Sequence, residues 1–341
     1  MAAGRVAMRA LSALCLSDGR PGHYNLSLGL LGAAGHLRPL SITRCEVRRG
    51  RWPGAPLAAW SNSGLAPERL LSTVYGLDAK QLAKVDLIVS AGAETLAANV
   101  ACARIFDAAN IFYGSLRYFR PHDFSLVLTS FPANASRARH AFALKPSQAA
   151  STVWQAPREK FVKPPRRLAL LVGGNSGESR YTCSDWDDLI GLIATLTQTN
   201  SIRWFVSNSR RTPDAVSDRL ASLPLEQFID VRAANSTPLA QLLATSDAAL
   251  VTDESSSMVS DAVSAGIPVL GVSPVHHRLS NNEQAYRAYL TQSGWYAAVP
   301  LAGLSSETVL GKLSSLTPTT EDPSLRLAQL LRDRLPDLFA N

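Results

Sequence analysis

The chain of 341 residues is 46% hydrophobic and 7% aromatic, which excludes an intrinsically disordered protein and supplies enough apolar residues for two cores. No apolar run reaches the length of a transmembrane helix. The four cysteines are scattered without CxxC spacing, so we expect reduced thiols in a cytoplasmic protein, with neither disulfides nor zinc.

The net charge of +7 is distributed unevenly along the chain. Through residue 165 there are 20 Lys and Arg against 9 Asp and Glu, whereas the remainder has 14 against 18. The densest basic cluster is Arg44, Arg48, Arg49 and Arg51. A basic first half predicts contact with an anionic acceptor or phospholipid surface, and a solvated surface is the alternative. Nucleic acid is not expected, because no aromatic-rich basic motif accompanies the dispersed Lys and Arg.

The first predicted elements form a strand, a glycine-containing turn and a helix. The strand covers Leu11 to Leu16, the turn contains Asp18, Gly19, Gly22 and His23, and the helix begins near Leu26. A helix that begins after such a turn favours anions, but the turn lacks the lysine of a Walker motif and the spacing of a dinucleotide fingerprint. His23 or Asp18 could act as a general base for a hydroxyl group, or His23 could be a structural or solvated residue.

Strands and helices then alternate, which predicts a doubly wound domain over residues 1–150. We expect strands at Leu37 to Ile42, Asp86 to Gly92, Ile111 to Tyr113 and Leu126 to Leu128, helices at Pro67 to Val74, Asp78 to Ala83 and Glu94 to Phe106, and an Arg-rich loop from Arg44 to Trp60. The proline-containing segment from Ala149 to Pro165 is the expected linker.

The second half repeats the alternation over residues 166–320. A strand from Leu168 to Val172 ends in Gly173, Gly174 and Asn175, where glycines allow a ligand to approach the backbone. A strand from Trp204 to Asn208 leads into Ser209, Arg210 and Arg211. Paired arginines at a strand end suit phosphate oxygens, although a solvated pair is the alternative.

A βαβ unit from Ala248 to Leu270 is the most informative stretch of the chain. Its first strand ends in Thr252, and a helix is expected from about Ser257 to Ala265. Ligands of parallel sheets lie beyond the carboxyl ends of the strands, so Thr252, Ser255, Ser256 and Ser257 are candidate diphosphate-binding residues, with Asp261 one helical turn further on. The alternative is that the serines only cap the helix.

The remaining segments carry less information. His276 and His277 lack the i, i+4 spacing and the acidic partners of a helical metal site, so no metal is expected. A tail helix within residues 321–341 is amphipathic. It is predicted to pack across a cleft between the domains, and membrane anchoring is the alternative.

Three blocks of this sequence resemble the mitochondrial-fission Elm family. They are Ser17 to His23, Ser207 to Pro213, and Val251 to Asp261. A more distant similarity, carried by Gly22-His23 and by Val259 to Pro268, links the chain to the peptidoglycan GlcNAc transferase. This second resemblance implies a GT-B-like fold of two Rossmann-like domains facing across a cleft. It also implies that residues 166–320 hold a nucleotide sugar, with Asp261 on the ribose, and that His23 faces the acceptor.

From residues and resemblance together we expect a metal-independent glycosyltransferase. Its co-substrate would be a nucleoside diphosphate sugar, with no other cofactor, and its acceptor would be linked to a membrane or to the cell envelope. The expected location is cytoplasmic, peripheral to the inner membrane. Two alternatives are a nucleotide-sugar epimerase or hydrolase, which would consume donor without an acceptor, and a non-enzymatic adaptor recruited to a membrane.

Overall fold

The computed structural model describes residues 9–148, 153–154, 164–177, 179–233 and 239–339. The chain divides into two compact units, Met1–Ser151 with Pro323–Asn341, and Thr152–Asp322. Most of the linker expected from Ala149 to Pro165 lies outside the described residues. The tail, residues 321–341, was predicted from the sequence to lie outside both domains. In the structure, Pro323–Asn341 belongs to the first unit.

The first unit contains a parallel sheet of six strands in the order β2-β1-β3-β4-β5-β6. The order changes direction between β1 and β3, and ligands of such sheets bind beyond the carboxyl ends of the strands at this switch point. The strands are β1 Leu11–Ser17, β2 Leu40–Glu46, β3 Leu87–Ala91, β4 Ala109–Tyr113, β5 Leu126–Thr129 and β6 His140–Phe142.

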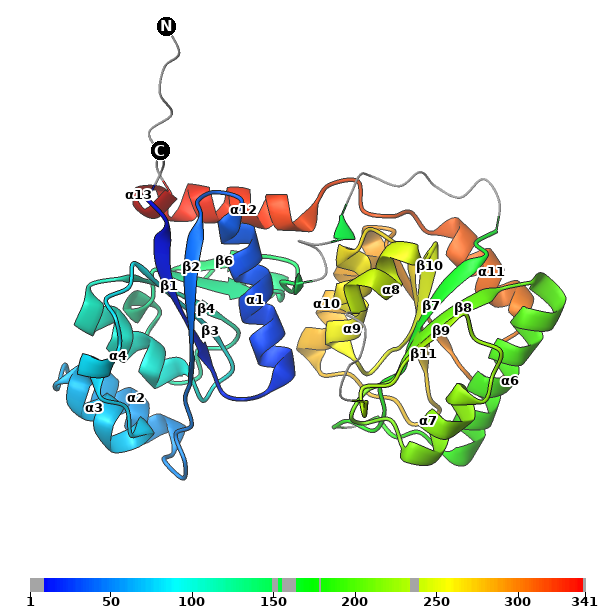
Figure 1. Cartoon of the computed structure of the whole chain (residues 1–341), viewed down its shortest axis with the longest axis horizontal. Coiled ribbons are helices and arrows are strands. Elements are labelled where there is room, and N and C mark those ends of the chain that lie inside the picture. The colour runs from blue at the N-terminus through cyan, green and yellow to red at the C-terminus, as the bar shows by residue number, and fades with distance from the viewer. Residues whose placement is uncertain (1–8, 149–152, 155–163, 178, 234–238, 340–341) are drawn as a thin grey trace, which may run out of the picture. The chain divides into compact units, whose positions relative to one another are not determined.

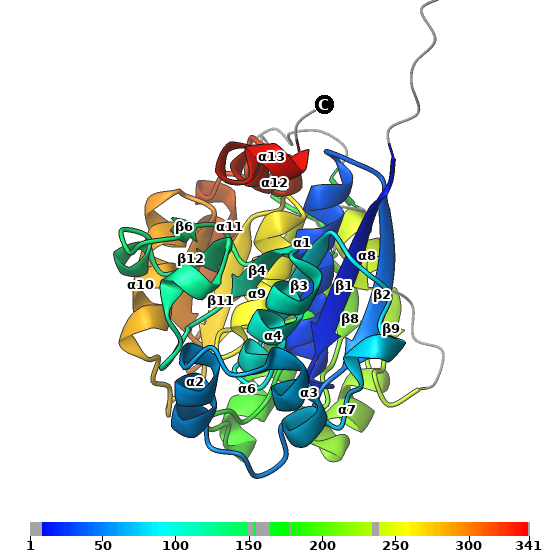
Figure 2. The ribbon, with the colours of Figure 1, turned by 90° about the vertical axis from the view of Figure 1, so that its left-hand side faces the viewer.

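Apolar helix faces cover both sides of this sheet. One face packs against α1 and the tail helix α12, with Leu30, Leu31, Leu327 and Leu331 buried in the same core. The other face packs against α2, α3 and α4, which lie together in Figure 2. The helices are α1 Pro21–Gly35, α2 Gly54–Asn62, α3 Pro67–Tyr75, α4 Leu96–Phe106, α12 Pro323–Arg334 and α13 Pro336–Phe339.

The second unit repeats this plan with the order β12-β11-β10-β7-β8-β9, again all parallel (Figure 1). Its switch point lies between β7 and β10, the two strands that precede the glycine-containing loop and the serine-rich loop. The strands are β7 Arg167–Leu171, β8 Arg203–Ser207, β9 Gln227–Ile229, β10 Ala248–Thr252, β11 Val269–Ser273 and β12 Tyr296–Pro300. The helices are α6 Cys183–Asn200, α7 Asp214–Ala221, α8 Leu239–Thr245, α9 Ser256–Ser264, α10 Asn281–Gln292 and α11 Ser306–Ser315.

The Arg-rich segment differs from the prediction of one loop from Arg44 to Trp60. Strand β2 continues to Glu46, and the nine-residue helix α2 begins at Gly54. Pro53 is the N-cap residue and Pro56 lies in the first turn, where proline is compatible with a helix. Leu57 and Ala58 of this helix are buried in the core on the α2–α4 side of the sheet, and this packing stabilises it.

Candidate functional site

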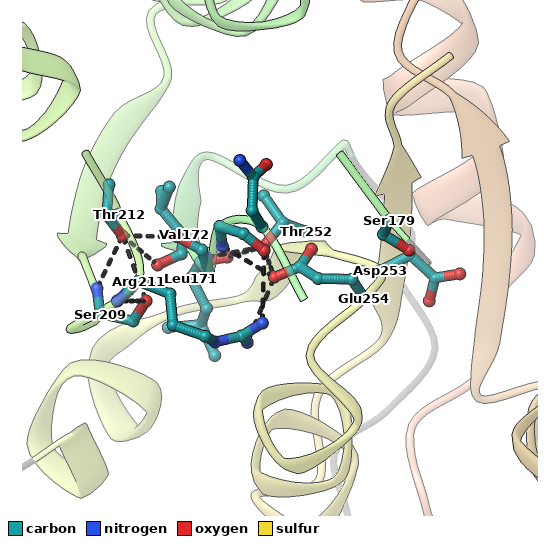
Figure 3. Close-up of polar contacts among 12 residues, drawn as sticks. Leu171, Val172, Ser179, Ser209, Arg211, Thr212, Thr252, Asp253 and Glu254 are labelled. Atoms are coloured by element: carbon teal, nitrogen blue, oxygen red, sulfur yellow. Dashed lines mark hydrogen bonds and ion pairs between the residues drawn. The ribbon is translucent and has the colours of Figure 1, made fainter. Parts of the chain in front are cut away.

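The two loops at the switch point of the second unit are hydrogen-bonded to each other. The amide of Gly173, after β7, donates to the Thr252 hydroxyl at 2.7 Å, and the amide of Gly174 donates to Glu254 Oε1 at 2.9 Å. Figure 3 shows Thr252 and Glu254 directed at this loop. The predicted residues Gly173, Gly174 and Thr252 are therefore brought together, through Glu254, which the sequence analysis did not select.

Glycine is required at both positions of this loop by the space around it. A Cβ atom on Gly173 would overlap the Glu254 carboxylate, and one on Gly174 would overlap the backbone carbonyl of Arg211. Any side chain would push the loops apart. The lack of side chains also lets the Glu254 carboxylate approach the Gly174 amide, so this position accepts an anionic oxygen.

Glu254 places an internal carboxylate among these groups. Its side chain is 1% exposed, and it accepts hydrogen bonds from Tyr181 Oη at 2.7 Å and from Gly174. Arg211 is its nearest cation, at 3.4 Å. Burial raises the pKa of Glu254, and the bonds from Tyr181 and Gly174 only partly offset that effect. Figure 3 shows Glu254 and Arg211 pointing toward one another from separate loops.

The loop after β8 supplies Arg211 and fixes the glycine backbone. The Thr212 hydroxyl donates to the Gly173 carbonyl at 2.6 Å and accepts from the Ser209 amide at 2.9 Å. Arg211 donates to the Gly174 carbonyl at 3.3 Å, while Arg210 is exposed. Of the two predicted arginines, it is Arg211 that contacts the glycine loop.

The hydroxyls before and within α9 have different surroundings. Ser255 is the N-cap residue and is buried, but its side chain makes no capping hydrogen bond. The Ser256 hydroxyl donates to Glu283 and accepts from Arg287 at 3.2 Å, so it is directed into a neighbouring network. Ser257 is exposed and Asp261 is half-buried on the same helix. The exposed residue Asn175 closes the glycine loop by accepting from the Tyr181 amide at 2.8 Å.

A buried ionic network, absent from the sequence analysis, supports the serine-rich loop. Asp253 accepts from Arg287 Nε at 2.8 Å, from His277 Nε2 at 3.1 Å and from the Tyr296 hydroxyl. On its other side the His277 ring meets the Ser179 hydroxyl at 2.8 Å. Burial disfavours the charge on Asp253, but the bond from His277 and the charge of Arg287 outweigh it, so the pKa of Asp253 is lowered. This network holds the loop between β10 and α9 in one conformation.

The first unit brings Asp18 and His23 together at its own switch point. Asp18 lies just beyond β1, and its carboxylate accepts from His23 Nδ1 at 2.7 Å. The Asp18 side chain is fully buried, whereas the His23 ring is 32% exposed. Gly92, after β3, has φ +93° and touches this pair so closely that a Cβ atom would overlap the His23 ring. Because Nδ1 is held by Asp18, Nε2 is the ring atom left to accept a proton.

Two further features bear on function. Among the described residues, no cluster of three or more His, Cys, Asp or Glu side chains has the arrangement of a metal site. Within the same part of the chain, no helix combines the length and apolar character needed to cross a membrane.

Two parallel six-stranded sheets, each with polar loops at its switch point, define a protein of the GT-B glycosyltransferase fold class. The sequence model of the family described as Mitochondrial fission ELM1 matches residues 21–335, and the chain belongs to that family. Both the predicted fold class and the predicted family are thus confirmed. Comparison with curated protein sequences finds no significant match.

Solved structures of two activities resemble this fold. A putative UDP-N-acetylglucosamine 2-epimerase from Listeria monocytogenes has a TM-score of 0.56 at 9% identity, covering 96% of this chain and 98% of that one. UDP-GlcNAc 2-epimerase from Neisseria meningitidis, bound to UDP-GlcNAc, has 0.54 at 11%, covering 96% and 100%. The glycosyltransferase SnogD from Streptomyces nogalater has 0.51 at 16%, covering 97% and 96%. At such identities the similarity shows the fold alone.

Proposed function

We propose that this protein is a glycosyltransferase that uses a nucleoside diphosphate sugar. The observation that carries the proposal is the convergence of the Gly174 amide, the Thr252 hydroxyl and the Arg211 guanidinium at the switch point of the second unit. Backbone amides and an arginine fork are the groups that hold a diphosphate in the absence of a metal ion. Stabilising that diphosphate as it leaves would stabilise charge that grows in the transition state.

The donor would bind at the loops that follow β7, β8 and β10. Its diphosphate would replace the Glu254 carboxylate as the acceptor of the Gly174 amide and the partner of Arg211. Asp261, half-buried on α9, would accept from the ribose hydroxyls. Ser255 and Ser257 would add hydroxyl donors next to the amino end of the same helix.

The acceptor would be activated by His23. Its Nε2 would take the proton of an acceptor hydroxyl as the oxygen attacks the anomeric carbon, and the bond from that carbon to the phosphate oxygen would break to release nucleoside diphosphate. Asp18 would stabilise the imidazolium that forms, because its buried carboxylate already bonds the other ring nitrogen. The acceptor is proposed to be anionic or membrane-borne, in keeping with the basic first half of the chain.

The first test is nucleotide binding by the second unit. A panel of nucleoside diphosphates and nucleotide sugars should contain at least one that raises the Tm of the full chain in proportion to the logarithm of its concentration. Absence of stabilisation by every member of the panel at millimolar concentration would rule out the donor half of the proposal.

Replacing Arg211 with alanine should weaken binding of the stabilising nucleoside diphosphate about ten- to hundredfold. A charge-assisted hydrogen bond to phosphate contributes about 1.5 to 3 kcal/mol, which corresponds to that loss. Isothermal titration calorimetry measures the change. Arg219→Ala is the matched control, because Arg219 forms an ion pair with exposed Asp187 at 2.8 Å at the surface of the same unit, and it should leave affinity within twofold. Equal losses in both variants would contradict a specific role for Arg211.

Replacing Glu254 with glutamine should tighten binding of the same nucleotide about tenfold at pH 7. A carboxylate displaced by the diphosphate would repel it, and two unit charges about 6 Å apart repel each other by about 1.4 kcal/mol at an effective dielectric constant near 40. The side-chain carbonyl oxygen of the glutamine can still accept the hydrogen bond from the Gly174 backbone amide, so the variant should remain folded.

The pH dependence gives Glu254 a second readout. Its pKa is already raised by burial, and a bound diphosphate raises it further, so binding takes up protons and wild-type affinity increases as the pH falls toward the raised pKa of Glu254. Titration of the nucleotide itself is common to both proteins. The difference in affinity between wild type and Glu254→Gln should therefore shrink as the pH falls below neutral, and a difference that stays constant would contradict this assignment.

An epimerase or hydrolase is the second candidate, favoured by the fold similarity to UDP-GlcNAc 2-epimerases. Such an enzyme would consume or convert the nucleotide sugar without an acceptor. Incubating the protein with each stabilising nucleotide sugar alone, and analysing the products by NMR, separates the two. A 2-epimeric sugar or free sugar favours this candidate, and unchanged donor favours the transferase.

A further inference from the structure

A small pocket opens within the first unit beyond the carboxyl ends of β3 and β4. Its volume is about 240 Å³. We call it the arginine pocket, and it is lined by Arg49, Gly54, Ala93, Leu96, Arg117, Tyr118 and Phe119. The lining residues come from three separate segments: the loop after β2 with the start of α2, the loop between β3 and α4, and the loop after β4. This volume suits a head group rather than a whole drug-sized ligand.

The electrostatics of the arginine pocket are uniformly positive. Neither Arg49 nor Arg117 makes an ion pair with a described residue, and no described lining residue is acidic. Glu94, the acid nearest in sequence, is directed to Arg20 at 3.3 Å. Arg49 is half-buried and Arg117 is exposed, so their two positive charges act together to attract an anion to the pocket.

Two helices begin at this pocket, and neither amino end is capped. Gly54 is the first residue of α2 and Leu96 is the first residue of α4. Neither helix has a side-chain capping bond or an acidic residue in its first turn. Their positive dipole ends therefore add to the charge of the two arginines.

The backbone at Arg117 supports a ligand-binding role. Arg117 has φ +57°, a left-handed conformation that few residues other than glycine adopt. Such a conformation costs of the order of 1 kcal/mol or more and is concentrated at functional sites. Here it presents Arg117 and the following Tyr118, which is 66% exposed, at the rim of the pocket.

The pocket is next to the proposed base. Gly92 is packed against His23 and Asp18, and the following residue, Ala93, lines the pocket. A molecule whose anionic group lies between Arg49 and Arg117 could therefore present a neighbouring hydroxyl to His23.

We propose that the arginine pocket binds the phosphate group of a phosphorylated acceptor. The existence of an anion site is inferred from the geometry of the pocket alone. The identification of the bound molecule as the acceptor rests on the proposed transferase function. The aromatic rim of Tyr118 and Phe119 suits an apolar or sugar group attached to the phosphate. The same phosphate chemistry is offered by a soluble sugar phosphate and by a lipid phosphate at a bilayer surface.

Inorganic pyrophosphate is the probe for the anion site. Because the glycine loop of the second unit could also bind it, the titration uses the full chain carrying Arg211→Ala. In this background pyrophosphate should bind, and the pair Arg49→Gln with Arg117→Gln should weaken binding at least tenfold. The matched pair Arg51→Gln with Arg120→Gln removes the same charge from exposed positions outside the pocket and should change affinity less than twofold.

A second variant guards against misfolding of the double mutant. Ala93→Glu places a carboxylate in the pocket just before the first turn of α4, where the helix dipole favours it, so the protein should stay folded and lose pyrophosphate binding. Equal effects of the two arginine pairs, or retained binding in Ala93→Glu, would overturn the proposal.

Vesicles identify the source of the phosphate. The protein is sedimented with phosphatidylcholine vesicles that contain phosphatidic acid. If it binds these vesicles, and if Arg49→Gln/Arg117→Gln loses this binding while Arg51→Gln/Arg120→Gln keeps it, the phosphate is carried by a lipid. Binding of pyrophosphate alone assigns a soluble phosphorylated compound. Nucleoside diphosphate stabilisation is measured in parallel for the wild type and for the pocket variants with Arg211 intact: its absence in every one of these proteins counts against the transferase and leaves the anion site standing.

Discussion

Replacing Arg287 with methionine is expected to lower the free energy of unfolding by about 3 to 5 kcal/mol. Arg287 is 6% exposed and donates to the carboxylate and to the backbone carbonyl of Asp253, each at 2.8 Å. Methionine fills much of the volume but leaves Asp253 as a buried charge without its cation, and breaking a buried pair in this way carries a penalty of about that size. For a unit of this length the Tm should fall by about 10 °C.

The control is an ion pair of the same kind at the surface. Arg219 bonds Asp187 at 2.8 Å, with side chains 45% and 62% exposed, so Arg219→Met should cost about 1 kcal/mol or less. Denaturant titration of wild type and both variants measures the difference. A loss below 1 kcal/mol for Arg287→Met would mean that the bonds from His277 and Tyr296 suffice to hold the Asp253 charge.

The pH dependence checks the same mechanism. The pKa of Asp253 is lowered in the folded protein, so its charge contributes stability above the unfolded-state pKa near 3.9 and loses that contribution as pH falls through the folded-state value. Loss of Arg287 removes much of this contribution. The stability gap between wild type and Arg287→Met should therefore be full at pH 7 and should narrow as the pH falls and Asp253 becomes protonated, first in the variant, where the arginine charge no longer lowers its pKa.

The strands that position the loops after β7 and β10 could be predicted from the sequence, because each strand end is marked by residues close to it in the chain. The apolar run from Ala248 to Val251 and the Gly173-Gly174 turn each define a strand end within a few residues, and β10 and β7 are found there. The beginning of α9 at Ser256 lies within one residue of its expected position. Parallel strands with helical crossovers then imply two doubly wound sheets.

The partners of the site could not be predicted in the same way. Asp253 and Arg287 are separated by 34 positions and meet only after α10 packs beside β12, so no periodicity connects them. Glu254 has no motif of its own, and its importance depends on Gly173 and Gly174 lying directly beneath it. The arginine pocket needs α2, a helix hidden from sequence patterns by Pro53 and Pro56.

Replacing His23 with alanine is expected to lower the rate of glycosyl transfer about 10²- to 10⁴-fold while leaving nucleoside diphosphate affinity unchanged. Transfer of a proton to a positioned base contributes a factor of that size, and the His23 ring is the partly exposed member of the Asp18 pair. The assay follows nucleoside diphosphate release from the stabilising donor in the presence of phosphorylated acceptors. His122→Ala is the control, because His122 is an exposed residue of the same unit that lies before β5, away from the loops that follow β1 and β3.

Asp18→Asn separates a positioning role from general destabilisation. Asparagine can keep a hydrogen bond to His23 Nδ1 but cannot stabilise the imidazolium, so transfer should fall by one to three orders of magnitude with little loss in Tm. If His23→Ala retains transfer within threefold of wild type, the proton must go to another group, and the base would have to be sought among donor or acceptor atoms instead.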